Sequence, residues 1–168
     1  MEHSEVLLTL TEVSVAFAGF SGIVAVFGRI DIGDWSIGDR YRFFALVETS
    51  LAAAFLSLVP FGLAAVRLSP GFVWRSASML SVAYMATSYA THILRYRSVP
   101  ADARSDAAWG DIYATGVADV VIVALNLYNV VTLGEPGLFL LGLILIVAEG
   151  GFFFARLLFQ ALSTQPRM

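Results

Sequence analysis

The chain has 168 residues, of which 58% are hydrophobic and only 14% are charged, and its formal net charge is −3. A water-soluble domain could not cover its surface with so few charged groups, because globular proteins carry about 25% charged residues. The composition therefore predicts a protein embedded in a membrane. The ten basic residues form no basic patch, so nucleic acid is not an expected partner.

The sequence contains neither cysteine nor lysine. These absences remove disulfides, cysteine-ligated metals, Schiff-base lysines and a P-loop lysine from consideration. The two histidines, His3 and His92, lack the spacing of metal ligands. A carboxylate-only site for Ca²⁺ or Mg²⁺ would require several acids to converge. We therefore expect no cofactor, no metal site and no enzymatic activity.

Five apolar stretches approach or exceed the ~20 residues that a helix needs to cross a bilayer. They cover residues 6–27, 43–66, 72–94, 112–133 and 138–162. We predict an all-α integral membrane bundle of five transmembrane helices, forming a single domain over residues 1–168. Residues 72–94 are the least hydrophobic of the five, so the alternative is four spans plus a re-entrant or interfacial third segment.

Local signals place several helix features. In the first stretch, Ser14, Ala18 and Gly22 are four residues apart, the small-xxx-small pattern that allows close helix packing in lipid. Ser36 followed by Asp39 is typical of a helix N-cap with an acidic first turn, which predicts that the second helix starts near Ile37. Pro60 should kink this helix or loosen its last turns.

The third stretch carries one polar face. We expect it to insert only by burying that face against neighbouring helices. The face consists of Trp74, Ser78, Ser81, Met85, Ser88, His92 and Arg95. Tight turns at residues 67–71 and 134–137 predict two antiparallel hairpins, whereas residues 95–110 read as a long polar loop.

The arginines predict the orientation, because short cytoplasmic loops are enriched in basic residues. With the N-terminus outside and the C-terminus in the cytoplasm, Arg67 and Arg75 lie outside. The remaining arginines lie inside: Arg29, Arg40, Arg42, Arg95, Arg97, Arg104, Arg156 and Arg167. Contact with anionic lipid headgroups explains Arg29, Arg40, Arg42, Arg95 and Arg97 without a specific ligand.

Polar side chains recur inside the predicted spans. In the fourth span, residues at steps of three and four share one helix face: Thr115, Asp119, Ile122, Asn126, Asn129 and Leu133. A carboxylate within hydrocarbon costs several kcal/mol unless it is paired, hydrated or protonated. Glu149 lies near the bilayer centre and is followed by Gly150 and Gly151, which would let another helix, water or an ion approach the backbone.

The functional interpretation of these groups is a path for protons or small cations, because carboxylates and amides relay protons or replace a hydration shell. The candidates are Glu149, Asp119, Asn126, Glu48, Glu12, His92 and Arg156. Glu149 and Asp119 form the expected centre, and Glu48 with His92 the expected inner mouth. The protein would be a homo-oligomeric channel or transporter-like protein, with the path between copies or as a narrow proton relay within one.

The alternative is a non-conducting accessory or signalling subunit. Its buried acids would then hold helices together through hydrogen bonds or a pairing with Arg156. Arg156 lies near enough to the inner interface to extend into the headgroups instead.

Two segments resemble parts of small, uncharacterised bacterial multi-span membrane proteins. They are FAGFSG at residues 17–22 and R-x-x-x-L-V-E-T-S-L-A at residues 42–52. The resemblance covers the first third of the chain. It implies a protein of the bacterial inner membrane and brings no activity with it.

Overall fold

The computed structural model describes residues 3–27, 35–99 and 106–163. Within these ranges the chain is helical and contains no strand. The α-helices are α1 (Ser4–Phe27), α2 (Ile37–Ala65), α3 (Pro70–Arg97), α4 (Asp106–Tyr128) and α5 (Pro136–Ser163). A short π-helix, Asn129–Leu133, continues α4 directly. The all-α prediction is confirmed for the described residues.

Four helical segments are long and apolar enough to cross a membrane. They are Ser4–Ile23 in α1, Ile37–Ala65 in α2, Trp109–Leu133 through α4 and the π-helix, and Pro136–Phe159 in α5. These segments confirm the prediction of a membrane protein. The third predicted span forms α3, which is 28 residues long but is not among the four.

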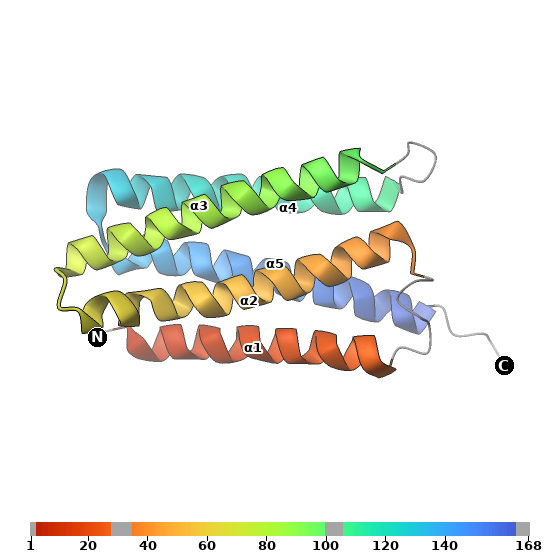
Figure 1. Ribbon diagram of the computed structural model, residues 1–168, viewed down its shortest axis with the longest axis horizontal. Coiled ribbons are helices and arrows are strands. Elements are labelled where there is room, and N and C mark those ends of the chain that lie inside the picture. The colour runs from red at the N-terminus through yellow and green to blue at the C-terminus, as the bar shows by residue number, and fades with distance from the viewer. Residues whose placement is uncertain (1–2, 28–34, 100–105, 164–168) are drawn as a thin grey trace.

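The five helices lie side by side, and consecutive helices run in opposite directions (Figure 1). Helix α2 packs against α3 and α5, and α4 packs against the same two helices, so these four close a ring. Helix α1 packs outside this ring, against α2 and α5. We call α2 to α5 the four-helix ring. One end of the ring, which we call the arginine end, holds the start of α2, the end of α3, the start of α4 and the end of α5.

The start of α2 follows from local chemistry. The Ser36 side chain accepts a hydrogen bond from the backbone N–H of Asp39 and caps the helix, which confirms the predicted start at Ile37. The cap satisfies one of the backbone N–H groups left free in the first turn. Pro60 lies inside α2, and the helix continues past it to Ala65.

The polar face of α3 is directed into the bundle, as predicted. Four of its residues are buried: Trp74, Ser78, Ser81 and Met85. Hydroxyl groups tolerate this environment because they find hydrogen-bond partners on neighbouring groups. Burying this face leaves the more apolar surface of α3 outside, where Met79 and Leu80 are exposed.

The turns at the other end of the ring are shorter than the sequence suggested. Only Gly134 and Glu135 separate the π-helix from α5. Gly134 adopts a left-handed φ of 64°, which a residue without a side chain tolerates best. The predicted loop over residues 95–110 is also too long. Helix α3 extends to Arg97 and α4 begins at Asp106, so the connection between them is shorter than predicted.

Candidate functional site

A small cavity lies in the core of the four-helix ring, and all four helices line it. Its volume is about 20 Å³, whereas a water needs roughly 10–15 Å³. The lining combines carboxyl, hydroxyl and aromatic groups: Tyr41, Ala45, Thr49, Tyr84, Met85, Ser88, Tyr89, His92, Ile112, Thr115, Asp119, Glu149 and Phe153. The cavity is therefore large enough for about one water, and each of the four helices contributes at least one polar side chain to its lining.

Glu149 contributes a buried carboxyl group to this cavity from α5. The residue is 6% exposed, and its Oε1 atom has no hydrogen-bond partner among the described residues. Glycine at position 150 lets α2 approach, since a Cβ there would lie 3.4 Å from Ser50 Oγ and 3.5 Å from Thr49 Oγ1. This confirms that another helix approaches the backbone beside Glu149. An unpartnered buried carboxyl is costly, so this group calls for a physical explanation.

Asp119 lines the same cavity from α4, where it is half-buried. Thr115, one turn earlier, also lines the cavity and donates its hydroxyl to the backbone carbonyl of Asp111 at 3.0 Å. The predicted face of α4 therefore points into the ring as far as Asn129, whereas Leu133 at its end is exposed. Ile122, Asn126 and Asn129 on that face are fully buried.

Glu48 and His92 meet at the seam between α2 and α3. The Glu48 carboxyl accepts a hydrogen bond from Ser88 Oγ at 2.8 Å, and its other oxygen lies 3.4 Å from His92 Nε2. The Tyr84 hydroxyl donates to the Glu48 backbone carbonyl at 3.3 Å. The Glu48 side chain is 33% exposed, so this pair connects the cavity to the ring's outer surface.

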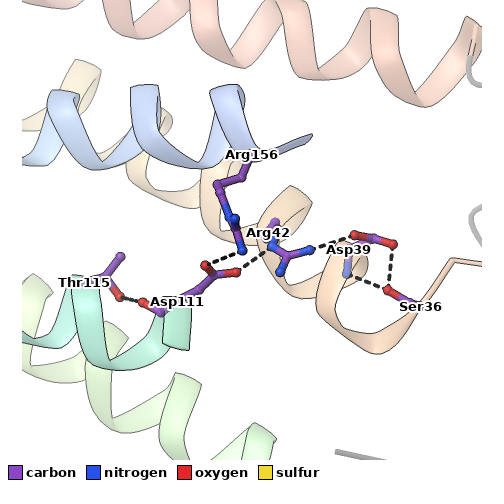
Figure 2. Close-up of polar contacts among 6 residues, drawn as sticks. All are labelled: Ser36, Asp39, Arg42, Asp111, Thr115 and Arg156. Atoms are coloured by element: carbon purple, nitrogen blue, oxygen red, sulfur yellow. Dashed lines mark hydrogen bonds and ion pairs between the residues drawn. The ribbon is translucent and has the colours of Figure 1, made fainter. Parts of the chain in front are cut away.

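An ion-pair cluster lies at the arginine end of the ring (Figure 2). Asp111 Oδ2 on α4 accepts a hydrogen bond from Arg42 Nε on α2 at 2.5 Å. The other oxygen of Asp111 lies 3.3 Å from Arg156 Nη2 on α5. Arg42 also donates to Asp39 Oδ1 at 3.0 Å. One carboxylate therefore joins three helices.

This cluster corrects one interpretation and adds a residue that sequence analysis missed. Arg42 is not a headgroup arginine, because it is buried and paired with Asp111. Asp111 lies between the predicted loop, residues 95–110, and the predicted span, residues 112–133. It lies four and eight residues before Thr115 and Asp119, so extending their helical face by one turn would have found it. Arg156 pairs with Asp111, and no contact with Glu149 is seen in the described structure.

Two asparagines lie in the other half of the ring. Asn126 donates to the Ile122 carbonyl at 2.9 Å, and its Oδ1 atom has no partner among the described residues. Asn129 instead has a structural role. Its Nδ2 donates to Ser78 Oγ and to the Glu135 carbonyl, both at 2.9 Å, and its Oδ1 accepts from the Glu135 N–H. These bonds join α3 to the turn before α5.

An apolar layer separates Asn126 from the cavity. Ile122 and Ile146 are both fully buried there and belong to one packed cluster with Met85. The predicted ladder of polar groups is thus interrupted along the ring axis. Glu12 lies apart from it, on an exposed position of α1, which packs outside the ring.

In the described ranges, no group of three or more histidine, aspartate or glutamate side chains could hold a metal ion. Asp119 and Glu149 share the cavity, whereas Glu48 lies outside its lining, beside His92. A comparison with protein-family models, with curated proteins and with solved structures finds no match.

Proposed function

We propose that this chain is a five-span integral membrane protein that moves protons across the bilayer through carboxyl groups in the four-helix ring. One observation carries the proposal. Glu149 lines a cavity that has room for water, and one oxygen of its buried carboxyl has no hydrogen-bond partner among the described residues. Ionisable side chains inside a membrane that face a water-filled cavity are typical of proton relays in pumps and transporters. Asp119 lines the same cavity.

The size of the cavity favours protons over metal cations. A volume of about 20 Å³ holds about one water and leaves no space for a hydrated ion. A dehydrated cation such as Ca²⁺ would need six to eight oxygen ligands. Three acidic or histidine groups do not converge anywhere among the described residues. Hydroxyl groups on Thr49, Ser88 and Thr115 can instead align water for proton transfer.

The packing of α3 supports five spans. Helix α3 is 28 residues long and packs between α2 and α4 with its polar face buried. At 1.5 Å per residue it is about 42 Å long, which exceeds the ~30 Å of hydrocarbon. The arginine end would then face the cytoplasm, with the N-terminus outside, in a bacterial inner membrane.

The interrupted polar ladder favours a transporter-like mechanism over an open channel. Glu48 and His92 would exchange protons with the cytoplasmic side, and Asp119 and Glu149 would hold them in the cavity. Beyond the cavity, Ile122 and Ile146 block water. Proton transfer to the Asn126 side therefore requires the helices to move, as in alternating access.

The path lies within one chain, so it needs no second copy. All four helices that line the cavity belong to the same ring. If the chain forms the predicted homo-oligomer in the lipid bilayer, each copy would therefore keep its own proton route.

A second candidate function is suggested by Glu12. This carboxyl is exposed on α1, inside a segment apolar enough to cross the membrane. A carboxylate that faces lipid is costly, and a contact with another membrane protein would cover it. The chain would then be a non-conducting accessory subunit. Loss of a co-purifying protein from the Glu12→Gln variant would favour this candidate.

Reconstitution into liposomes that contain a pH-sensitive dye tests the proposal. A potassium diffusion potential set by valinomycin should drive a pH change faster in liposomes with the protein than in empty ones. Replacing external sodium by choline should not alter that rate, since protons are the moving species. A rate equal to that of empty liposomes would refute proton movement, and a rate that follows sodium would assign another cation.

A further inference from the structure

We propose that Arg42, Asp111 and Arg156 form a latch that closes the cavity toward the arginine end. This inference rests on the proposed function, because a proton carrier must open its site to one side at a time. In this structure the latch is closed, and Asp111 is bonded to both arginines (Figure 2).

The position of the latch follows from its neighbours along the chain. Arg42 follows Tyr41, and Asp111 precedes Ile112, so two latch residues adjoin residues that line the cavity. Arg156 comes three residues after Phe153, which places it about one turn beyond a third lining residue. The latch therefore forms the layer that directly follows the cavity on this side.

The two arms of the latch differ in strength. The Arg42 side chain is 5% exposed, and Asp39 holds it from the opposite side. The Ser36 hydroxyl in turn donates to Asp39 at 2.6 Å. The Arg156 side chain is 46% exposed and makes the longer contact, at 3.3 Å. Arg42 is thus the fixed arm, and Arg156 is the arm that releases.

Aromatic packing closes the other half of the same layer. Tyr96 on α3 and Trp109 on α4 lie edge to face with ring centres 4.5 Å apart. Tyr96 and Ile112 are buried together, with Tyr41 packed against them. These contacts hold α4 to α3 and α2. The latch therefore opens by separating α5 from α4 at the arginine end, where the exposed Arg156 supplies the ion pair to Asp111 that has to break.

A single introduced thiol reports on this opening, because the natural chain has no cysteine. Thr115→Cys places a thiol in the cavity, one turn from Asp111. Its rate of reaction with a small, charged, membrane-impermeant methanethiosulfonate is measured in vesicles that expose the arginine end, and in vesicles of the opposite orientation. The test variant adds Arg156→Gln. Arg156→Lys keeps the charge, and Arg75→Gln serves as the control, because Arg75 contacts the Thr132 carbonyl at the other end.

We expect Arg156→Gln to raise the reaction rate about fivefold from the arginine end, the factor expected for loss of one partly exposed ion pair. Arg156→Lys should fall between it and the parent, and Arg75→Gln should match the parent. Equal rates in all variants would overturn the latch, and so would an equal rise from both membrane sides. The thiol reaction tests only the latch, and the liposome flux tests only proton movement. Failure of one proposal can therefore be told apart from failure of the other.

Discussion

Glu149 on α5 and Asp119 on α4 line one cavity from adjacent antiparallel helices, which the π-helix Asn129–Leu133 and the two residues after it connect. The two carboxyls differ in their surroundings. Glu149 is buried beside α2, whereas Asp119 is half-buried. The ring therefore has two carboxyl groups, each able to accept a proton, in the lining of one cavity. It is the arrangement on which the proposed function depends.

Asp111→Asn should destabilise the protein by about 1.5–3 kcal/mol, because Arg42 and Arg156 lose a charged partner while Arg42 keeps its pair with Asp39. Thermal unfolding in detergent measures the change. Glu5→Gln alters an exposed carboxyl in the first turn of α1 and should leave the transition where it is. An Asp111→Asn variant as stable as the parent would show that the ion pairs contribute little.

Gly142→Ala should destabilise the protein by about 1–3 kcal/mol through overpacking. A Cβ at position 142 would collide with the Asn126 amide group. Asn126→Ala removes that group, so the double variant should recover part of the loss. Gly62→Ala is the control, since a Cβ there meets no atom within 4 Å. Losses that simply add in the double variant would contradict the close contact.

Asn129→Ala should cost roughly 1–3 kcal/mol, because Glu135 and Ser78 lose their partners. Detergent unfolding is again the measurement. Thr132→Ala is matched to it, since its hydroxyl only donates to the Tyr128 carbonyl within the same helical segment. If both variants lose the same stability, Asn129 does not hold this turn.

Five spans predict that the two ends of α3 lie on opposite sides of the membrane. Single thiols at Ser69→Cys and Ser98→Cys lie at exposed positions that flank this helix. An impermeant maleimide should label the first from outside intact cells and the second only after the membrane is opened. Labelling of both from the same side would support four spans and a third helix that does not cross.

The helices were largely predictable from the sequence, because a long run of apolar residues is by itself a strong signal of a membrane helix. The start of α2 and the buried face of α3 also follow from local residue patterns. Loop lengths were harder to predict. Arg97 and Asp106 are polar, and whether their turns become helical depends on packing against neighbouring helices. Whether α3 crosses the membrane stays a prediction, because burial in the ring offsets its lower hydropathy.

The candidate site was partly predictable. Helical spacing placed Asp119 on an interior face, and Glu48 with His92 does form a pair. Spacing within one helix cannot tell which helices are neighbours, however. The Asp111 contacts with Arg42 and Arg156 depend on the order of helices around the ring. The apolar layer at Ile122 and Ile146 depends on it equally.

Proton flux in the Glu149→Gln variant tests the central claim most directly. Glutamine keeps the size of the side chain but cannot release a proton, so dye-reported flux should fall by about 100-fold or more. Glu12→Gln makes the same chemical change at an exposed position of α1 and should keep the parent rate. Matching unfolding transitions would confirm that both variants are folded. An unchanged flux in folded Glu149→Gln would contradict the account.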